Sequence, residues 1–175
     1  RKMCVSVHKC DQDNMEGLDL GGAKHFAVIK GAPDRIIKNS TINVPEWDSS
    51  SHRIKIGGAA SDEDKKNFDE ANLEMAKGAL RVIMVGVQAL SDADIQKLEN
   101  IATAEERMQW FLSRSTCMLG LIGVLDPPRT GVREAVRRAH EAGIRVIMIT
   151  GDQQNTAAAI AKDIGILKPH HTMER

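Results

Sequence analysis

The sequence predicts an α/β fold that divides into two parts at about residue 125. Apolar runs rich in Val and Ile alternate along the chain with stretches whose apolar residues recur at helical spacing. The two prolines of Asp126–Arg129 (Asp-Pro-Pro-Arg) form a stiff connection that neither a helix nor a central strand can continue. The unbroken apolar run 146–149 then stops at Thr150-Gly151-Asp152, directly before a helical pattern, as a buried parallel strand does in an α/β unit.

The first elements are two strands and a short helix. Strands are expected over residues 3–8 and 25–30, separated by a polar loop that contains glycine. Pro33 is tolerated in the first turn of a helix, so a helix is expected from there to about Lys38. Residues 39–61 are rich in Ser, Asn and Gly and are expected to be mostly loop.

A longer helix is predicted after Ser61, because Ser61 and Asp64 have the spacing of a capping box. Its apolar residues share one face, and Gly78 marks its end. The elements that follow are a strand over 80–90, a short helix capped by Ser91, a brief helical turn near 108–112 and a strand over 116–125.

The second part reads as a compact α-β-α unit. Thr130 is expected to cap its first helix and Gly143 to end it, before a strand over 144–149 and a helix over 156–164. A strand end that presents a hydroxyl, a glycine and a carboxylate to a helix N-terminus suits phosphate chemistry, because that terminus offers unpaired N–H groups. The alternative is an ordinary turn in which Asp152 is a local cap.

Composition excludes several classes of function. In 175 residues, 24 Lys and Arg balance 24 Asp and Glu, which removes any global electrostatic argument for nucleic acid or an anionic membrane surface. No apolar run approaches the roughly 20 residues that cross a bilayer. The three cysteines have no metal-ligand spacing and are expected to be reduced thiols. The start at Arg1 is not a signal peptide, and we expect a piece of a longer polypeptide.

Four motifs occur together and in order: Lys-Gly-Ala-Pro-Asp at 30–34, Leu-Arg at 80–81, Asp-Pro-Pro-Arg at 126–129 and Met-Ile-Thr-Gly-Asp at 148–152. Together they resemble the cytoplasmic catalytic region of P-type cation-transporting ATPases, most closely the type II subgroup that includes calcium pumps. The resemblance covers nearly the whole chain. It implies that residues 1–124 are the later part of a nucleotide-binding domain, a mainly antiparallel sheet with helices. Residues 125–175 would be part of the phosphorylation domain, a haloacid-dehalogenase-like parallel α/β unit.

The resemblance also implies an activity, cofactors and partners. The parent would be an ion-translocating ATPase that uses ATP and Mg²⁺, with calcium the favoured ion. Its partners would be the remainder of the pump with its membrane helices, and no nucleic acid. This piece would lie on the cytosolic face of the membrane.

The resemblance further implies which residues form the site, because positions in this sequence match those of the family's motifs. Lys30 and Arg81 match cations that bind ATP, since an ammonium meets phosphate or the face of adenine and a guanidinium fork suits phosphate. Without the motif context each would be a solvated side chain beside a strand. The full set implied is Lys2, Lys30, Gly31, Ala32, Arg81, Asp126 and Arg129 for nucleotide binding, and Thr150, Gly151 and Asp152 for phosphoryl transfer, with Asp152 near magnesium and no metal-ligand set.

The family's phosphorylated aspartate lies in an Asp-Lys-Thr-Gly-Thr run, and the sequence contains no such run. The later Gly-Asp-Gly motif and the aromatic residue that stacks on adenine are also missing. We therefore expect weak ATP binding and no complete catalytic cycle from this chain alone. Two alternatives stay open: a phosphohydrolase of the haloacid-dehalogenase kind, and a nucleotide-binding module without turnover.

Overall fold

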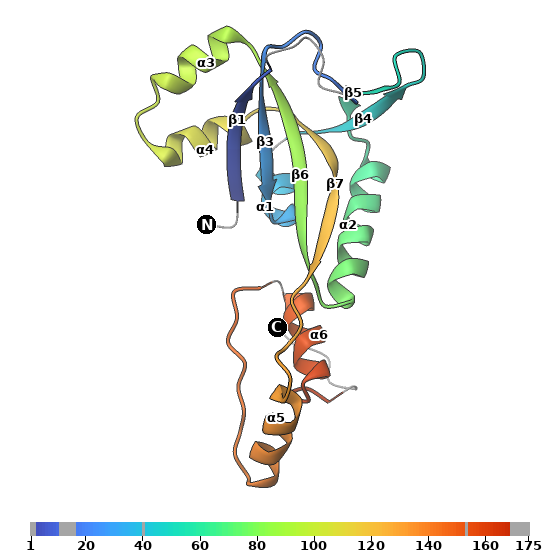
Figure 1. Ribbon diagram of the computed structural model, residues 1–175, viewed down its shortest axis with the longest axis vertical. Helices are drawn as coiled ribbons and strands as arrows, with labels where there is room; N and C mark the ends of the chain where they lie inside the picture. The colour runs from blue at the N-terminus through green and yellow to red at the C-terminus, as the bar shows by residue number, and fades with distance from the viewer. Residues whose placement is uncertain (1–2, 11–16, 40, 153, 169–175) are drawn as a thin grey trace. The chain divides into compact units, whose positions relative to one another are not determined.

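The computed structural model describes residues 3–10, 17–39, 41–152 and 154–168 (Figure 1). The chain divides into two compact units. Unit 1 consists of Arg1–Phe68 and Ile83–Ile122, and unit 2 consists of Asp69–Val82 and Gly123–Arg175. Within the described ranges, no helix combines the length and the apolar character needed to cross a membrane.

The described residues form one mixed sheet of seven strands, in the order β1-β3-β6-β7-β4-β5-β2. Its strands are β1 (Met3–Lys9), β2 (Leu18–Asp19), β3 (His25–Gly31), β4 (Ile42–Asp48), β5 (Arg53–Ala59), β6 (Leu80–Leu90) and β7 (Thr116–Leu125). The pairs β1–β3, β3–β6 and β4–β5 are antiparallel, whereas β4–β7 and β2–β5 are parallel. The mainly antiparallel α/β fold expected for this part is confirmed, and β6 and β7 have the predicted bounds.

The prediction that residues 39–61 are mostly loop is wrong, because they contain the β4–β5 hairpin. Cross-strand contacts give this polar segment its strand structure: the Asn43 side-chain amide donates to the Gly57 carbonyl at 2.9 Å. The Lys55 ammonium lies 2.6 Å from the Asp48 carboxylate. Short β2 likewise lies in the stretch expected to be loop.

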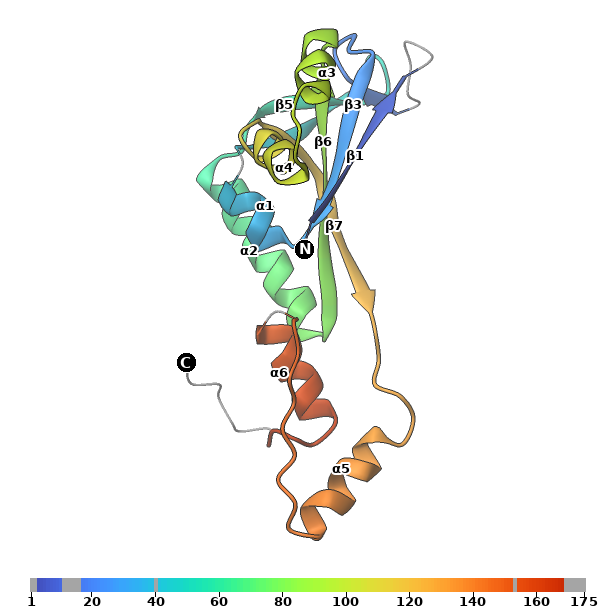
Figure 2. The ribbon, with the colours of Figure 1, turned by 90° about the vertical axis from the view of Figure 1, so that its left-hand side faces the viewer.

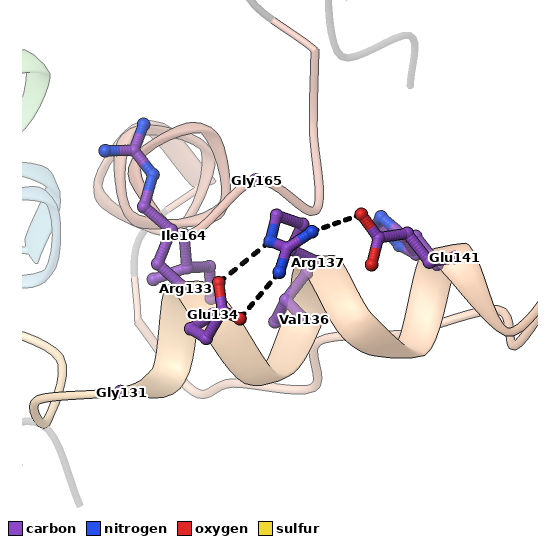
Figure 3. A pocket seen from close by; sticks show the side chains of 9 residues that line it. Gly131, Arg133, Glu134, Val136, Arg137, Glu141, Ile164 and Gly165 are labelled. Carbon is purple, nitrogen blue, oxygen red and sulfur yellow. Dashed lines mark hydrogen bonds and ion pairs between the residues drawn. The ribbon is translucent and has the colours of Figure 1, made fainter.

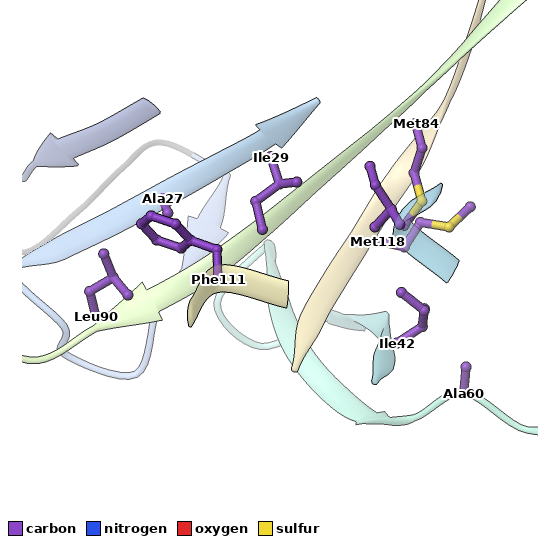
Figure 4. Close-up of a cluster of buried hydrophobic side chains, with 9 residues drawn as sticks. Ala27, Ile29, Ile42, Ala60, Met84, Leu90, Phe111 and Met118 are labelled. Carbon is purple, nitrogen blue, oxygen red and sulfur yellow. The ribbon is translucent and has the colours of Figure 1, made fainter. Parts of the chain in front are cut away.

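Four of the described helices belong wholly or partly to unit 1: α1 (Pro33–Asn39), α2 (Asp62–Lys77), α3 (Asp92–Glu99) and α4 (Ala104–Leu112) (Figure 2). The capping box at the start of α2 is confirmed, since the Asp64 N–H donates to Ser61 Oγ and the Ser61 N–H donates back to Asp64. Ser91 caps α3 as predicted. Figure 4 shows the hydrophobic core, where side chains from β3, β6, β7 and α4 converge. Its buried members are Ala27, Ile29, Ile36, Ile42, Ala60, Met84, Leu90, Phe111 and Met118.

Unit 2 contains α5 (Val132–Glu141) and α6 (Gln154–Asp163), together with the start of β6 and the end of β7. Gly143 and Gly165 follow the two helices with φ of 72° and 83°, the left-handed backbone expected where a helix ends at glycine. Thr130 does not cap α5. Gly131 occupies the N-cap position with φ of 92° and makes no side-chain capping bond.

The predicted strand over 144–149 is not formed. Residues 144–150 have no regular secondary structure, and Ile144, Ile147 and Ile149 are 59%, 68% and 94% exposed. A parallel strand needs a neighbour to receive its hydrogen bonds, and the described strands include none that pairs with this segment. Thr150 and Asp152 therefore do not stand at the end of a buried strand.

Candidate functional site

Three predicted site residues from distant parts of the sequence meet in unit 2. Arg81, the second residue of β6, places its Nε 3.1 Å from Asp152 Oδ1 and its Nη1 3.8 Å from Asp126 Oδ2. The Arg81 and Asp126 side chains are 56% and 71% exposed, whereas that of Asp152 is only 26% exposed. The guanidinium is thus held mainly by one half-buried carboxylate, with a second, looser one beside it.

The turn that carries Asp152 is closed by its own hydrogen bonds. Thr150 Oγ1 donates to Asp152 Oδ2 at 3.0 Å and accepts from the Asp152 N–H at 3.1 Å. Gly151 is exposed, and a Cβ added to it would meet no atom within 4 Å. The turn therefore presents an open backbone beside a hydroxyl and a guanidinium, which are groups that can bind a phosphoryl group, whereas the Asp152 carboxylate occupies the guanidinium in their place.

Lys30 lies in unit 1 near the end of β3, exposed to solvent. Its cross-strand partners are Cys4 on β1 and Val85 on β6. Ile83 shares the face of Val85, because alternate residues of a strand point the same way, and it is 36% exposed. The ammonium of Lys30 thus stands beside accessible apolar surface, a combination that suits a ligand with both an anionic group and an aromatic ring.

The residues after Lys30 lead the chain directly into α1. Gly31 is the last residue of β3, Ala32 forms the connection, and both are half-buried. Pro33 is fully buried at the start of α1. The Ala32 carbonyl accepts the N–H groups of Arg35 and Ile36. This tight strand-to-helix connection fixes the backbone next to Lys30.

Two predicted site residues remain, Lys2 and Arg129. Lys2 lies outside the described residues. Arg129 is exposed in the segment between β7 and α5, and its carbonyl accepts the Val132 N–H. Sequence reasoning missed Ile83 and Val85, although Val85 is the cross-strand partner of Lys30 and Ile83 shares its face of β6. The binding and catalytic roles of all these residues stay predictions.

The described residues of unit 2 are poorly suited to hold magnesium without a ligand. Mg²⁺ takes about six oxygen ligands in octahedral geometry. The described part of the chain contains no group of three or more Asp, Glu, His or Cys side chains placed to hold a metal. Asp126 and Asp152 both face Arg81, whose positive charge opposes a cation there.

A separate pocket of about 690 Å³ lies in unit 2 between α5 and the end of α6 (Figure 3). Arg137 is tied there to Glu134 and Glu141 by ion pairs. Hydrogen bonds from Arg137 and then Arg138 lower the pKa of Glu134 to about 2. Because these cations are already paired with carboxylates, the pocket offers little net charge to a phosphate, and none of the predicted site residues lines it.

Comparison with known proteins finds a family and a set of relatives. Residues 1–131 match the family described as "P-type ATPase, cytoplasmic domain N". The P-type sodium-transporting ATPase4 of Toxoplasma gondii is 43% identical over 95% of this chain and 13% of its own length. The calcium-transporting ATPase of Bacillus subtilis is 34% identical over 82% of this chain and 14% of its own length. The sodium/potassium-transporting ATPase subunit alpha-1 of Catostomus commersonii is 34% identical over 95% of this chain and 14% of its own length. The chain thus spans only a small part of the relatives it matches.

Proposed function

Because the chain belongs to the P-type cation-transporting ATPase family, we propose that it is an ATP-binding cytoplasmic piece of a membrane-bound cation pump. The single observation that carries the proposal is the match of residues 1–131 to the cytoplasmic N domain, a region that includes the exposed Lys30. In the parent enzyme, ATP would phosphorylate an aspartate that this chain lacks. The remainder of the pump, with its membrane helices, is its partner.

Lys30 is the residue on which nucleotide binding depends most. Its ammonium attracts the phosphates, while Ile83 and Val85 offer apolar surface to the base. Gly31 and Ala32 have small side chains, which let the nucleotide approach the backbone closely. Mg²⁺ enters with the nucleotide, since it is commonly bound through substrate phosphates and few protein ligands.

Arg81 and the 150–152 turn serve the phosphoryl group. The planar guanidinium of Arg81 suits phosphate oxygens, and the N–H of Gly151 is a further donor. The Thr150 hydroxyl, which donates to Asp152, would turn from that carboxylate to the phosphate. These groups stabilise and position charge, which is most of what a protein contributes to phosphoryl transfer. The assignment of residues 1–124 to the nucleotide-binding domain and of 125–175 to a haloacid-dehalogenase-like phosphorylation domain belongs to the same proposal.

The transported ion has two candidates. The motifs favour calcium, and a calcium-transporting relative is 34% identical. The 43% identity to a sodium-transporting relative favours sodium. Transport by the full-length pump, reconstituted in vesicles and measured with radioactive Na⁺ and Ca²⁺ in parallel, separates them, because only the cognate ion accumulates in an ATP-dependent way.

Nucleotide binding is tested by NMR titration of this chain with ATP. We expect saturable shifts of the Lys30 and Arg81 signals, and Lys30→Gln should weaken binding about tenfold, the value of one charge-assisted hydrogen bond. The control is Lys38→Gln, which removes another exposed lysine of unit 1. Unmoved Lys30 and Arg81 signals at millimolar ATP, with shifts elsewhere, would contradict the assignment. No acid-stable phosphorylation of the chain is expected.

A further inference from the structure

Thr156 has a contact that its place in the sequence does not suggest. It lies in the first turn of α6, and its partner is 76 residues away in the sequence. Here Thr156 is only 2% exposed, and its Oγ1 donates to the carbonyl of Leu80 at 3.1 Å. Both residues belong to unit 2, so this bond joins the start of α6 to the start of β6.

The acceptor of this bond lies directly before Arg81. The carbonyl of Leu80 and the N–H of Arg81 share one rigid peptide plane. Because Arg81 lies in β6, where φ is confined to extended values, a hydrogen bond that restricts the rotation of this plane also restricts the direction in which the Arg81 side chain leaves the backbone. The Leu80 side chain is held as well, since a Cβ on Gly123 would come within 2.7 Å of Leu80 Cδ1.

The donor, Thr156, lies close in the sequence to the other partner of the ion pair, Asp152. Thr156 is four residues from Asp152, so α6 is the element that the 150–152 turn leads into. The Thr156 side chain thus joins β6, which contains Arg81, to the helix that follows Asp152. Arg81 Nε lies 3.1 Å from Asp152 Oδ1. Without the Thr156 bond, the Leu80–Arg81 peptide could rotate and the guanidinium would sample more orientations.

We propose that Thr156 is a positioning residue for nucleotide binding: its buried hydroxyl orients the Leu80–Arg81 peptide so that Arg81 faces the ligand phosphates beside the 150–152 turn. The inference rests on the proposed function, because it takes Arg81 as a phosphate-binding residue. It adds a residue that has no contact with nucleotide and acts only through Arg81.

The test compares ATP affinity, measured by NMR titration, in chains altered at Thr156. Thr156→Val keeps the shape and removes the donor, and should weaken ATP binding roughly threefold, within the range of a single hydrogen bond. Thr156→Ser keeps the donor and should restore wild-type affinity. Thr130→Val is the control, since Thr130 is an exposed threonine of the same unit. If the valine variant does not fold, Thr156→Ala also lacks the hydroxyl and suits a helix.

The deciding measurement is the double variant with Arg81→Gln. If Thr156 acts through Arg81, Thr156→Val has no further effect on affinity once Arg81 is gone. The Arg81 Nε–H signal should also shift in Thr156→Val and return in Thr156→Ser. Equal losses with and without Arg81, or a serine variant that behaves like valine, would overturn the inference while leaving nucleotide binding intact. Arg81→Gln that alone leaves ATP affinity unchanged would instead refute the role proposed for Arg81.

Discussion

Replacement of Asp152 by Asn should tighten ATP binding by this chain, because Asp152 competes with phosphate for Arg81. The two side chains meet at 3.1 Å, and with 56% and 26% of their surfaces exposed the pair is only partly screened by water. Exposed ion pairs contribute about 0.2–1 kcal/mol, and the half-buried carboxylate places this one near the upper value. Its removal should therefore increase ATP affinity up to about fivefold. The looser Asp126, at 3.8 Å and 71% exposed, should matter less.

The assay is an ATP titration of Asp152→Asn, Asp126→Asn and Asp163→Asn at low and at high salt. Asp163 lies at the end of α6 in the same unit, exposed, so its variant makes the same change in net charge away from Arg81. We expect the gain to follow the order Asp152, Asp126, Asp163, and to shrink at high salt because phosphate binding is screened. An Asp152→Asn chain that binds ATP no better than Asp163→Asn would refute the competition.

Three further predictions concern stability. Burial raises the pKa of Asp94, but hydrogen bonds from the N-cap serine and the bidentate pair with Arg114, at 2.9 and 3.1 Å, outweigh it and lower the pKa. This stabilisation is present above the unfolded pKa and is lost as pH falls through the folded one. Asp94→Asn should thus cost about 2 kcal/mol at pH 7 in urea unfolding, and the cost should shrink as the pH is lowered below the unfolded pKa of the carboxyl; a cost that does not change on acidification would contradict this. Gly86→Ala should destabilise by about 1–3 kcal/mol, since its Cβ would lie 2.5 Å from Thr116 Cγ2. Ala79 has φ of 60°, which favours glycine, so Ala79→Gly should increase the free energy of unfolding by about 1 kcal/mol and raise the melting temperature. A lower melting temperature in this variant would contradict the prediction.

The sequence predicted elements wherever local signals sufficed. The apolar runs of β6 and β7 gave their bounds, and the serine before α3 gave its start. The β4–β5 hairpin was missed because proline and polar residues interrupt its strands, and proline within a strand usually argues against one. Pro45 lies where the β4–β5 register shifts, so the sheet accommodates it at an irregularity. That accommodation depends on the partner strand, which local composition does not describe.

For the site, too, the sequence indicated individual residues but not the contacts between them. Motifs identified Arg81, Asp126 and Asp152 singly, but their meeting depends on how β6, β7 and α6 pack in unit 2. Thr156 was not recognised at all, because a threonine in the first turn of a helix is an ordinary residue there. Its significance lies in its acceptor, the Leu80 carbonyl, which no sequence spacing indicates.

The unformed strand over 144–149 explains why these side-chain contacts matter. A β-branched apolar segment has the tendency to form a strand, but its structure comes from hydrogen bonds to a neighbour. Since residues 144–149 make no such pairing, the backbone ladder does not place the 150–152 turn. The turn is placed instead by the Arg81–Asp152 ion pair and by α6, which Thr156 fastens to the start of β6. In this chain the geometry of the predicted phosphate site therefore depends on a few side-chain bonds, so single substitutions at Asp152 and Thr156 should change it measurably.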